Sequence, residues 1–192
     1  MVRFENVTDW SSMQIRARSD INTVVVHRIE VSQEDPSYAD TAGDVARFFA
    51  EHEIGKKATG GAMPYPILIA PDGSIVQTVP LERITPHARS HNKTGIGVGC
   101  LGDFRAREPS PAQLRSLVLV CASLCRSFEV NFDSVSGHDE LTEASSDPDK
   151  ECPGRAISMD ELRRSVAEAM DNGAELGFCW DRQDVERAAD SR

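Results

Sequence analysis

The order of apolar and polar residues along the chain predicts several β-strands. Asn22 to His27 reads Asn-Thr-Val-Val-Val-His, and an unbroken valine run is typical of a strand that is buried on both faces. Gly95 to Leu101 predicts a central strand, and glycine at every second position would let a ligand or a neighbouring backbone approach it closely. Pro64 to Ala70 and Ser74 to Val79 flank a Pro-Asp-Gly turn, so together they predict a β-hairpin.

Apolar residues recur at helical spacing in three other stretches. The first runs from Asp40 to Glu53. The second begins at Ser110, where serine is a good N-cap and Pro111 suits the first helical position. The third begins with a capping box at Ser158 and runs through Met170. The buried stripe of the second helix is expected to contain Leu114, Leu117, Val118, Cys121, Leu124, Cys125 and Phe128.

Composition and charge narrow the possible partners. The length of 192 residues suits one domain that needs no disulfide or metal to fold. The 21 basic and 31 acidic side chains give a net charge of −10, which argues against a nucleic-acid partner. No apolar run approaches the ~20 residues of a membrane span. The N-terminal residues lack the apolar core of a secretory signal, so we expect synthesis in the cytoplasm and no membrane partner.

One stretch, Ser136 to Gly154, contains two potential metal ligands. His138 and Cys152 are side chains of the types that Zn²⁺ prefers, and a zinc site needs at least one more. His27 is the natural third ligand, because the end of a buried strand holds a side chain rigidly. Three protein ligands leave one position open, as in catalytic zinc sites. A single histidine or cysteine more often packs in a core, so spacing alone leaves both interpretations open.

Four blocks of sequence carry a family resemblance. They are Val24-Val-Val-His27; Tyr65-Pro-Ile-Leu-Ile-Ala-Pro-Asp-Gly73; His87-Ala-Arg-Ser-His-Asn92 with Gly95-Ile-Gly-Val98 and Gly102-Asp-Phe104; and Gly137-His138 with Lys150-Glu-Cys-Pro-Gly154. In this order they resemble the zinc-dependent N-acetylmuramoyl-L-alanine amidase family, which includes a phage lysozyme and the peptidoglycan recognition proteins. The resemblance implies an α/β fold with a central mixed β-sheet flanked by helices, in a single domain over residues 21–172. Residues 1–20 would then form an arm, and residues 173–192 a tail that is either docked or disordered.

The resemblance also implies roles for individual side chains. His27, His138 and Cys152 would bind Zn²⁺ as the cofactor. Lys150 would donate a hydrogen bond to the oxyanion of the tetrahedral intermediate. Tyr65 would orient the attacking water or help to protonate the leaving amine. Without the resemblance, we would interpret Tyr65 as a packed amphipathic ring.

Other positions bear on the substrate groove and on the branch of the family. His87 and Asn92 would lie behind the ligands or line the groove, with an exposed loop histidine as the alternative for His87. Gly99 stands where one branch carries a catalytic glutamate, so the resemblance is to the phage-lysozyme branch, which relies on the tyrosine and the lysine. Arg28 and Pro66 depart from the family pattern, and Arg28 leaves the entrance to the groove undefined.

By resemblance, the chain would hydrolyse the amide bond between N-acetylmuramic acid and L-alanine. Its partner would be peptidoglycan or a muropeptide, and we expect it to be a monomer. The lack of a signal favours an endolysin, or an effector that a secretion machine delivers to the cell wall. Two alternatives stay open: a peptidoglycan-binding module without catalysis, and a zinc amidase that acts on small muropeptides or acylated amino acids.

Overall fold

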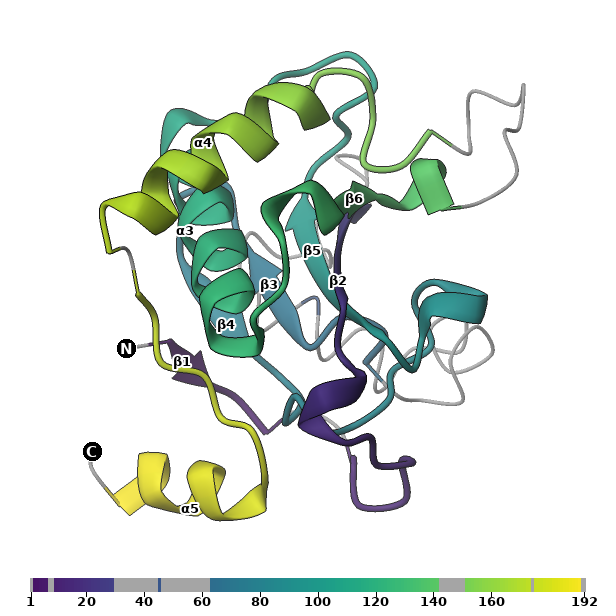
Figure 1. Cartoon of the computed structure of the whole chain (residues 1–192), viewed down its shortest axis with the longest axis vertical. Helices are drawn as coiled ribbons and strands as arrows, with labels where there is room; N and C mark the ends of the chain where they lie inside the picture. Colours follow the sequence, from purple (N-terminus) through teal and green to yellow (C-terminus); the bar gives the residue numbers. More distant parts are fainter. Residues whose placement is uncertain are drawn as a thin grey trace.

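A six-stranded mixed sheet forms the centre of the computed structural model, which describes residues 2–6, 9–29, 45, 63–141, 151–173 and 175–190 (Figure 1). The strand order is β1-β4-β3-β5-β2-β6. The strands are β1 (Arg3–Phe4), β2 (Thr23–Ile29), β3 (Ile67–Ile69), β4 (Ile75–Gln77), β5 (Gly95–Leu101) and β6 (Val135–Gly137). Only the β3–β4 pair is antiparallel among these strands. The predicted α/β fold with a central mixed sheet is therefore confirmed.

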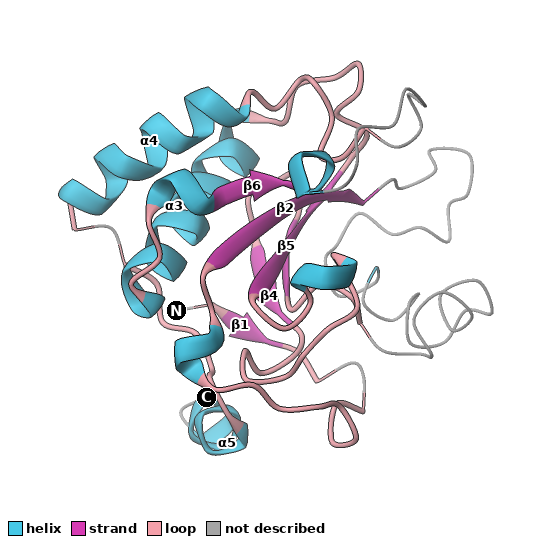
Figure 2. Cartoon of the chain, turned by 45° about the vertical axis from the view of Figure 1, so that its right-hand side comes forward, coloured by secondary structure: helices cyan, strands magenta, loops and turns pink. Residues whose placement is uncertain are grey.

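Helices α3 (Pro111–Phe128) and α4 (Met159–Asp171) pack together over one face of the sheet (Figure 2). A third helix, α5 (Arg182–Asp190), lies near the C-terminus. Short 3-10 helices are η1 (Arg18–Asp20), η2 (Arg89–His91), η3 (Phe132–Ser134) and η4 (His138–Leu141). The predicted helix from Asp40 to Glu53 lies outside the described residues except for Val45, which is helical and buried. Within the described ranges, no helix is both long enough and apolar enough to cross a bilayer.

Strands β2 and β5 are buried on both faces, as the valine run predicts. Val24 and Val26 on one face belong to the main core, into which α3 and α4 also pack. Each fully buried valine contributes about 1.5–3 kcal/mol relative to an exposed one. The parallel register pairs His27 with Gly99, so both residues lie on the opposite face. That face is the one that carries the chemically active side chains.

Local sequence signals set the ends of the elements. The hairpin turns at Gly73, whose φ of +85° suits glycine, and Ile69 pairs with Ile75 across it. Ser110 caps α3 by accepting a hydrogen bond from the Gln113 amide at 3.0 Å. One predicted core residue is wrong: Leu114 is 41% exposed, because in the first turn of α3 it faces an open groove between α3 and α4 rather than the sheet.

The N-terminal and C-terminal segments both contact strand β4. Strand β1 pairs in parallel with β4 at the edge of the sheet. In the tail, the Cys179 amide donates to the Gln77 side chain at 2.8 Å, and the Gln77 amide donates back to the Cys179 carbonyl at 2.7 Å. The Trp180 ring contacts Phe128 at 5.6 Å between centroids. Residues 176–180 of the tail are thus docked, whereas α5 has no buried residue.

Candidate metal centre

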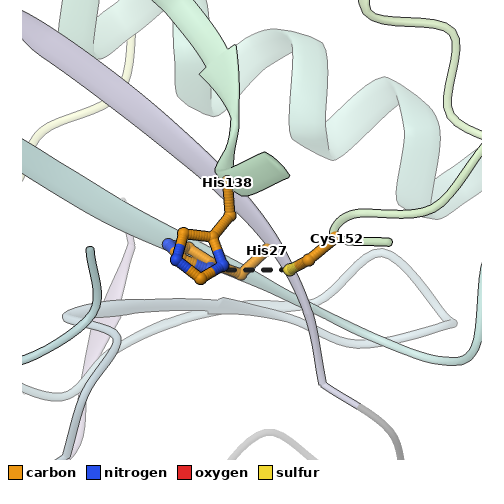
Figure 3. A group of neighbouring side chains, drawn as sticks. All are labelled: His27, His138 and Cys152. Atoms are coloured by element: carbon orange, nitrogen blue, oxygen red, sulfur yellow. Dashed lines mark hydrogen bonds between the residues drawn. The ribbon is translucent and has the colours of Figure 1, made fainter. Parts of the chain in front are cut away.

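Neighbouring parallel strands place two histidine rings side by side. His27 is the fifth residue of β2, and His138 follows the last residue of β6. The register pairs Val26 with Gly137, so the next residue on each strand points to the same face. The two rings are 4.6 Å apart between centroids. Cys152 reaches the same point from the loop before α4 (Figure 3).

The three side chains lie close enough together to hold a metal ion. Their ligand atoms lie within 4.8 Å of one another, and His27 Nδ1 is 3.7 Å from Cys152 Sγ. Tetrahedral zinc with ordinary bond lengths requires ligand atoms about 3.5 Å apart. Within the described residues, this is the one group of three or more potential ligands that is close enough to hold a metal ion. The donor set of two imidazoles and one thiol therefore fits Zn²⁺.

Arg28 holds the loop that carries Cys152. Its side chain is only 8% exposed, and its Nε donates to the Glu151 carbonyl at 2.7 Å. Its Nη1 contacts the Asp103 carboxylate at 3.4 Å. Its backbone N–H donates to the Cys152 sulfur. The Arg28 side chain thus points into the protein and holds the loop that carries Cys152.

Burial sets the protonation states of the three potential ligands. Burial, and then the charges of His87 and His138, hold the pKa of His27 well below its ordinary value. Burial also lowers the pKa of His138. Burial raises the pKa of the Cys152 thiol to about 11, against the opposing effects of the Arg28 N–H and charge. At neutral pH the metal-free site therefore contains two neutral imidazoles and a protonated thiol.

Tyr65 lies against the His27 ring. The two ring centroids are 4.8 Å apart. A Cβ on Gly99 would lie 3.1 Å from Tyr65 Cγ, so the missing side chain at Gly99 makes room for the tyrosine. Burial raises the pKa of Tyr65 above its ordinary value, and the Cys152 charge adds to the shift. Tyr65 therefore remains a phenol at physiological pH and can donate a hydrogen bond.

His87 lies behind His27, and Asn92 fixes its backbone. His87 is 8% exposed, which rules out the alternative of an exposed loop histidine. Its Nδ1 is 3.1 Å from His27 Nε2, and its Nε2 is 3.2 Å from the Gly95 carbonyl oxygen. The Asn92 Oδ1 accepts hydrogen bonds from the His87 and Ala88 amides at 2.9 and 2.6 Å. Burial lowers the pKa of His87 to about 4.

The remaining predicted site residue, Lys150, lies outside the described residues. One buried charged residue near the site has no counterpart in the sequence predictions. Arg16 is 2% exposed, and its Nη1 donates to the Gly95 carbonyl at 2.5 Å. A lone arginine in a polar segment gives no periodic signal of burial, so the sequence pattern could not have indicated it.

Comparisons with known proteins identify the family of the chain and solved structures with a similar fold. The model of a family described as N-acetylmuramoyl-L-alanine amidase matches residues 17–155. The fold is similar to the endolysin amidase LysCS from Clostridium intestinale, with 21% identity over 87% of this chain and 95% of that chain and a TM-score of 0.66. It is also similar to the peptidoglycan recognition protein SA of Drosophila, with 16% identity, coverage of 93% and 95%, and a TM-score of 0.63. A third similar structure is the endolysin of a Thermus scotoductus bacteriophage, with 21% identity, coverage of 80% and 89%, and a TM-score of 0.60. A search of curated protein sequences found no match.

Proposed function

Because the chain belongs to the N-acetylmuramoyl-L-alanine amidase family, we propose that it is a zinc-dependent hydrolase that cuts the amide bond between N-acetylmuramic acid and L-alanine in peptidoglycan. The observation that carries this proposal is the cluster of His27, His138 and Cys152, whose ligand atoms lie within 4.8 Å of one another. All three residues lie in the segment that the family model matches. A purely peptidoglycan-binding role would not require a thiol in that cluster.

The proposed cofactor fits the protonation states of the site. When bound, zinc would supply electrophilic assistance to an amide carbonyl and would lower the pKa of a water molecule toward ~7. His27 and His138 offer neutral nitrogen lone pairs without a prior loss of protons. Cys152 would give up its proton and supply the negative charge, which the Arg28 N–H and guanidinium stabilise.

Two further side chains would act on the reacting amide. Tyr65 remains protonated and lies beside His27, so we assign it a donor role toward the attacking water or the leaving nitrogen. Its raised pKa argues against a role as a general base. We assign Lys150, by resemblance to the family, to the oxyanion that develops on the carbonyl oxygen. His87 and Asn92 are proposed to support the ligands rather than to contact substrate, since His87 bonds to the buried side of His27 and Asn92 holds the His87 backbone.

The proposed function is tested by peptide release from purified sacculi. The zinc-loaded protein is expected to release peptides that begin with a free L-alanine amine and to create no new reducing sugar ends. Chelated protein should release none. Release from soluble muropeptides but not from sacculi would indicate the smaller substrate instead. Binding to sacculi without any release by zinc-loaded protein would indicate a binding module, and a protein that takes up no zinc would overturn the proposal.

Lys150→Ala is expected to lower turnover by roughly two orders of magnitude while zinc stays bound, because one oxyanion donor is worth about 3 kcal/mol. Peptide release and zinc content should be measured on the same preparation. Lys93→Ala is the matched control, since Lys93 is an exposed lysine whose side chain pairs with Asp20. Full activity of the Lys150 variant would remove the lysine from the mechanism.

Zinc affinity is expected to weaken about tenfold as the pH falls from 8 to 7, because binding releases one proton. The reason is that the Cys152 thiol, with a pKa of about 11, is protonated throughout this range and must ionise. The two histidines have lowered pKa values and release no proton. Competition with a chelator of known affinity measures the slope. A dependence on two or three protons would show that the imidazoles are protonated in the metal-free site.

A further inference from the structure

A series of hydrogen bonds leads from the buried side chain of Arg16 to the potential ligand His27. Arg16 Nη1 donates to the Gly95 carbonyl at 2.5 Å, the same oxygen lies 3.2 Å from His87 Nε2, and His87 Nδ1 lies 3.1 Å from His27 Nε2. Arg16 is 2% exposed, His27 1% and His87 8%, so bulk water does not compete for these bonds. We propose that Arg16 and His87 are positioning residues that fix the proton of His27 on Nε2 and so present Nδ1 as its ligand atom. The proposal rests on the proposed zinc site.

The chemistry of the partners fixes which atom donates and which accepts in each of these hydrogen bonds. A carbonyl oxygen has no proton to give, so the bond to Gly95 exists only if His87 Nε2 carries a hydrogen. A neutral His87 then has a lone pair on Nδ1, which accepts from His27 Nε2. The Nδ1 of His27 is left as a lone pair, and it is the atom that faces Cys152 Sγ at 3.7 Å (Figure 3). In the metal-free site the thiol donates to this nitrogen, and a cation would take the place of that proton.

Strand β5 is shaped to hold the His87 ring in this position. A Cβ on Gly97 would lie 3.0 Å from His87 Cγ, and a Cβ on Gly95 would lie 3.2 Å from His87 Cε1. The ring therefore packs directly on the backbone of the strand. Asn92 holds the other end of the residue, because its Oδ1 accepts the His87 amide hydrogen at 2.9 Å. The His87 ring therefore has little freedom to turn and break its hydrogen bonds to His27 and Gly95.

Arg16 fastens the loop that carries His87 at both of its ends. Its Nε donates to the Leu81 carbonyl at 2.9 Å, before the loop. Its Nη1 lies 3.3 Å from the carbonyls of Asn92 and Lys93 and closer still to that of Gly95, after the loop. In the described part of the chain, every acceptor of Arg16 is a backbone carbonyl. Arg16 also lies just outside the segment that the family model matches. It thus joins the N-terminal arm to the proposed metal site.

The direct test is nitrogen NMR of zinc-free protein with isotope-labelled histidines, which distinguishes a protonated from an unprotonated ring nitrogen. We expect His27 to carry its proton on Nε2 in the wild type and to become a mixture of tautomers in His87→Leu. Zinc affinity, measured by chelator competition, should fall about 10- to 100-fold in His87→Leu, as is usual when the hydrogen-bond partner of a ligand is lost. A His27 proton on Nδ1 in the wild type would overturn the proposal, as would unchanged zinc affinity in His87→Leu.

Arg16 is tested by a pair of variants and a control. Arg16→Met is expected to weaken zinc binding about tenfold, whereas Arg16→Lys, which keeps a buried cation donor for Gly95, should recover part of the loss. Arg18→Met is the control, because Arg18 is an exposed residue of the same arm. If Arg16→Met does not fold, the zinc affinity of Arg16→Lys is compared with that of the wild type instead. Wild-type zinc affinity in a folded Arg16→Met would exclude Arg16 as a positioning residue. A wild type that binds no zinc would overturn the proposed function. The NMR result would still show which nitrogen of His27 carries the proton.

Discussion

Replacing Cys152 by serine is expected to remove zinc from the protein and to abolish peptide release from sacculi. The wild type should contain about one zinc per chain, as a site with three protein ligands requires. A hydroxyl does not ionise near neutral pH and is a poor ligand for zinc, so the variant should retain only two ligands, His27 and His138. We expect zinc content near zero after dialysis and a loss of activity of at least about a hundredfold.

Cys179→Ser is the matched control for this change. Cys179 is buried like the cysteines of the core, but it lies in the docked tail beside Gln77 and outside the segment that the family model matches. It should keep zinc and activity, although its stability can change. Circular dichroism would show whether Cys152→Ser remains folded. If a folded Cys152→Ser keeps both zinc and activity, the ligand set is wrong.

Gly154→Ala is expected to destabilise the protein by roughly 2 to 6 kcal/mol. Gly154 has a φ of +104°, which L-residues rarely adopt, and this conformation alone costs about 1–3 kcal/mol with a side chain. An added Cβ would also lie 2.6 Å from the Phe104 carbonyl carbon and 2.8 Å from the Arg105 nitrogen. Both are backbone atoms that no rotamer change can move, so overpacking adds about 1–3 kcal/mol. Thermal unfolding should shift down by roughly 10 °C for a chain of this size.

Gly173→Ala separates the two causes. Gly173 also has a positive φ, of +74°, but a Cβ there would meet its nearest atom only at 4.0 Å. It should therefore lose about 1 kcal/mol, from the backbone conformation alone. The Gly154 variant should also bind zinc more weakly, because the clash displaces the loop that carries Cys152. Equal melting temperatures for the two variants would show that the contact with Phe104 does not constrain this loop.

Local sequence signals predicted strands β2, β3, β4 and β5 and helices α3 and α4, because those signals act over a few residues. The valine run predicted a strand from Asn22 to His27, and the structure extends it to Ile29, because Arg28 and Ile29 pair with Cys100 and Leu101. The hairpin follows from its Pro-Asp-Gly turn, and the starts of α3 and α4 follow from their serine caps. The exposed Leu114 shows the limit of this reasoning. Periodicity predicts which face of α3 is apolar, but the position of α4 decides which residues of that face are buried.

The candidate site, too, was predicted only in part from the sequence. Residue types left both packing and metal binding open for His27, His138 and Cys152, and the family resemblance carried by the four blocks made them candidate ligands. The sequence also determined that Gly95, Gly97 and Gly99 leave space on one face of a strand. It did not show that the His87 ring packs on Gly97, or that Ile29 and Tyr65 occupy the space beside Gly99.

Only the tertiary structure decided which of these residues meet. Strand β2 lies between β5 and β6, and this order, together with the register, brings His138 to His27 and places Gly99 beside it. The burial of Arg16, and its link through Gly95 to His87, likewise depends on where the N-terminal arm crosses the loop from Leu81 to Gly95. Strand order and register minimise the free energy of the whole chain, so no short stretch contains them. A local pattern determines what a residue can do, and the assembled sheet determines which residues act together.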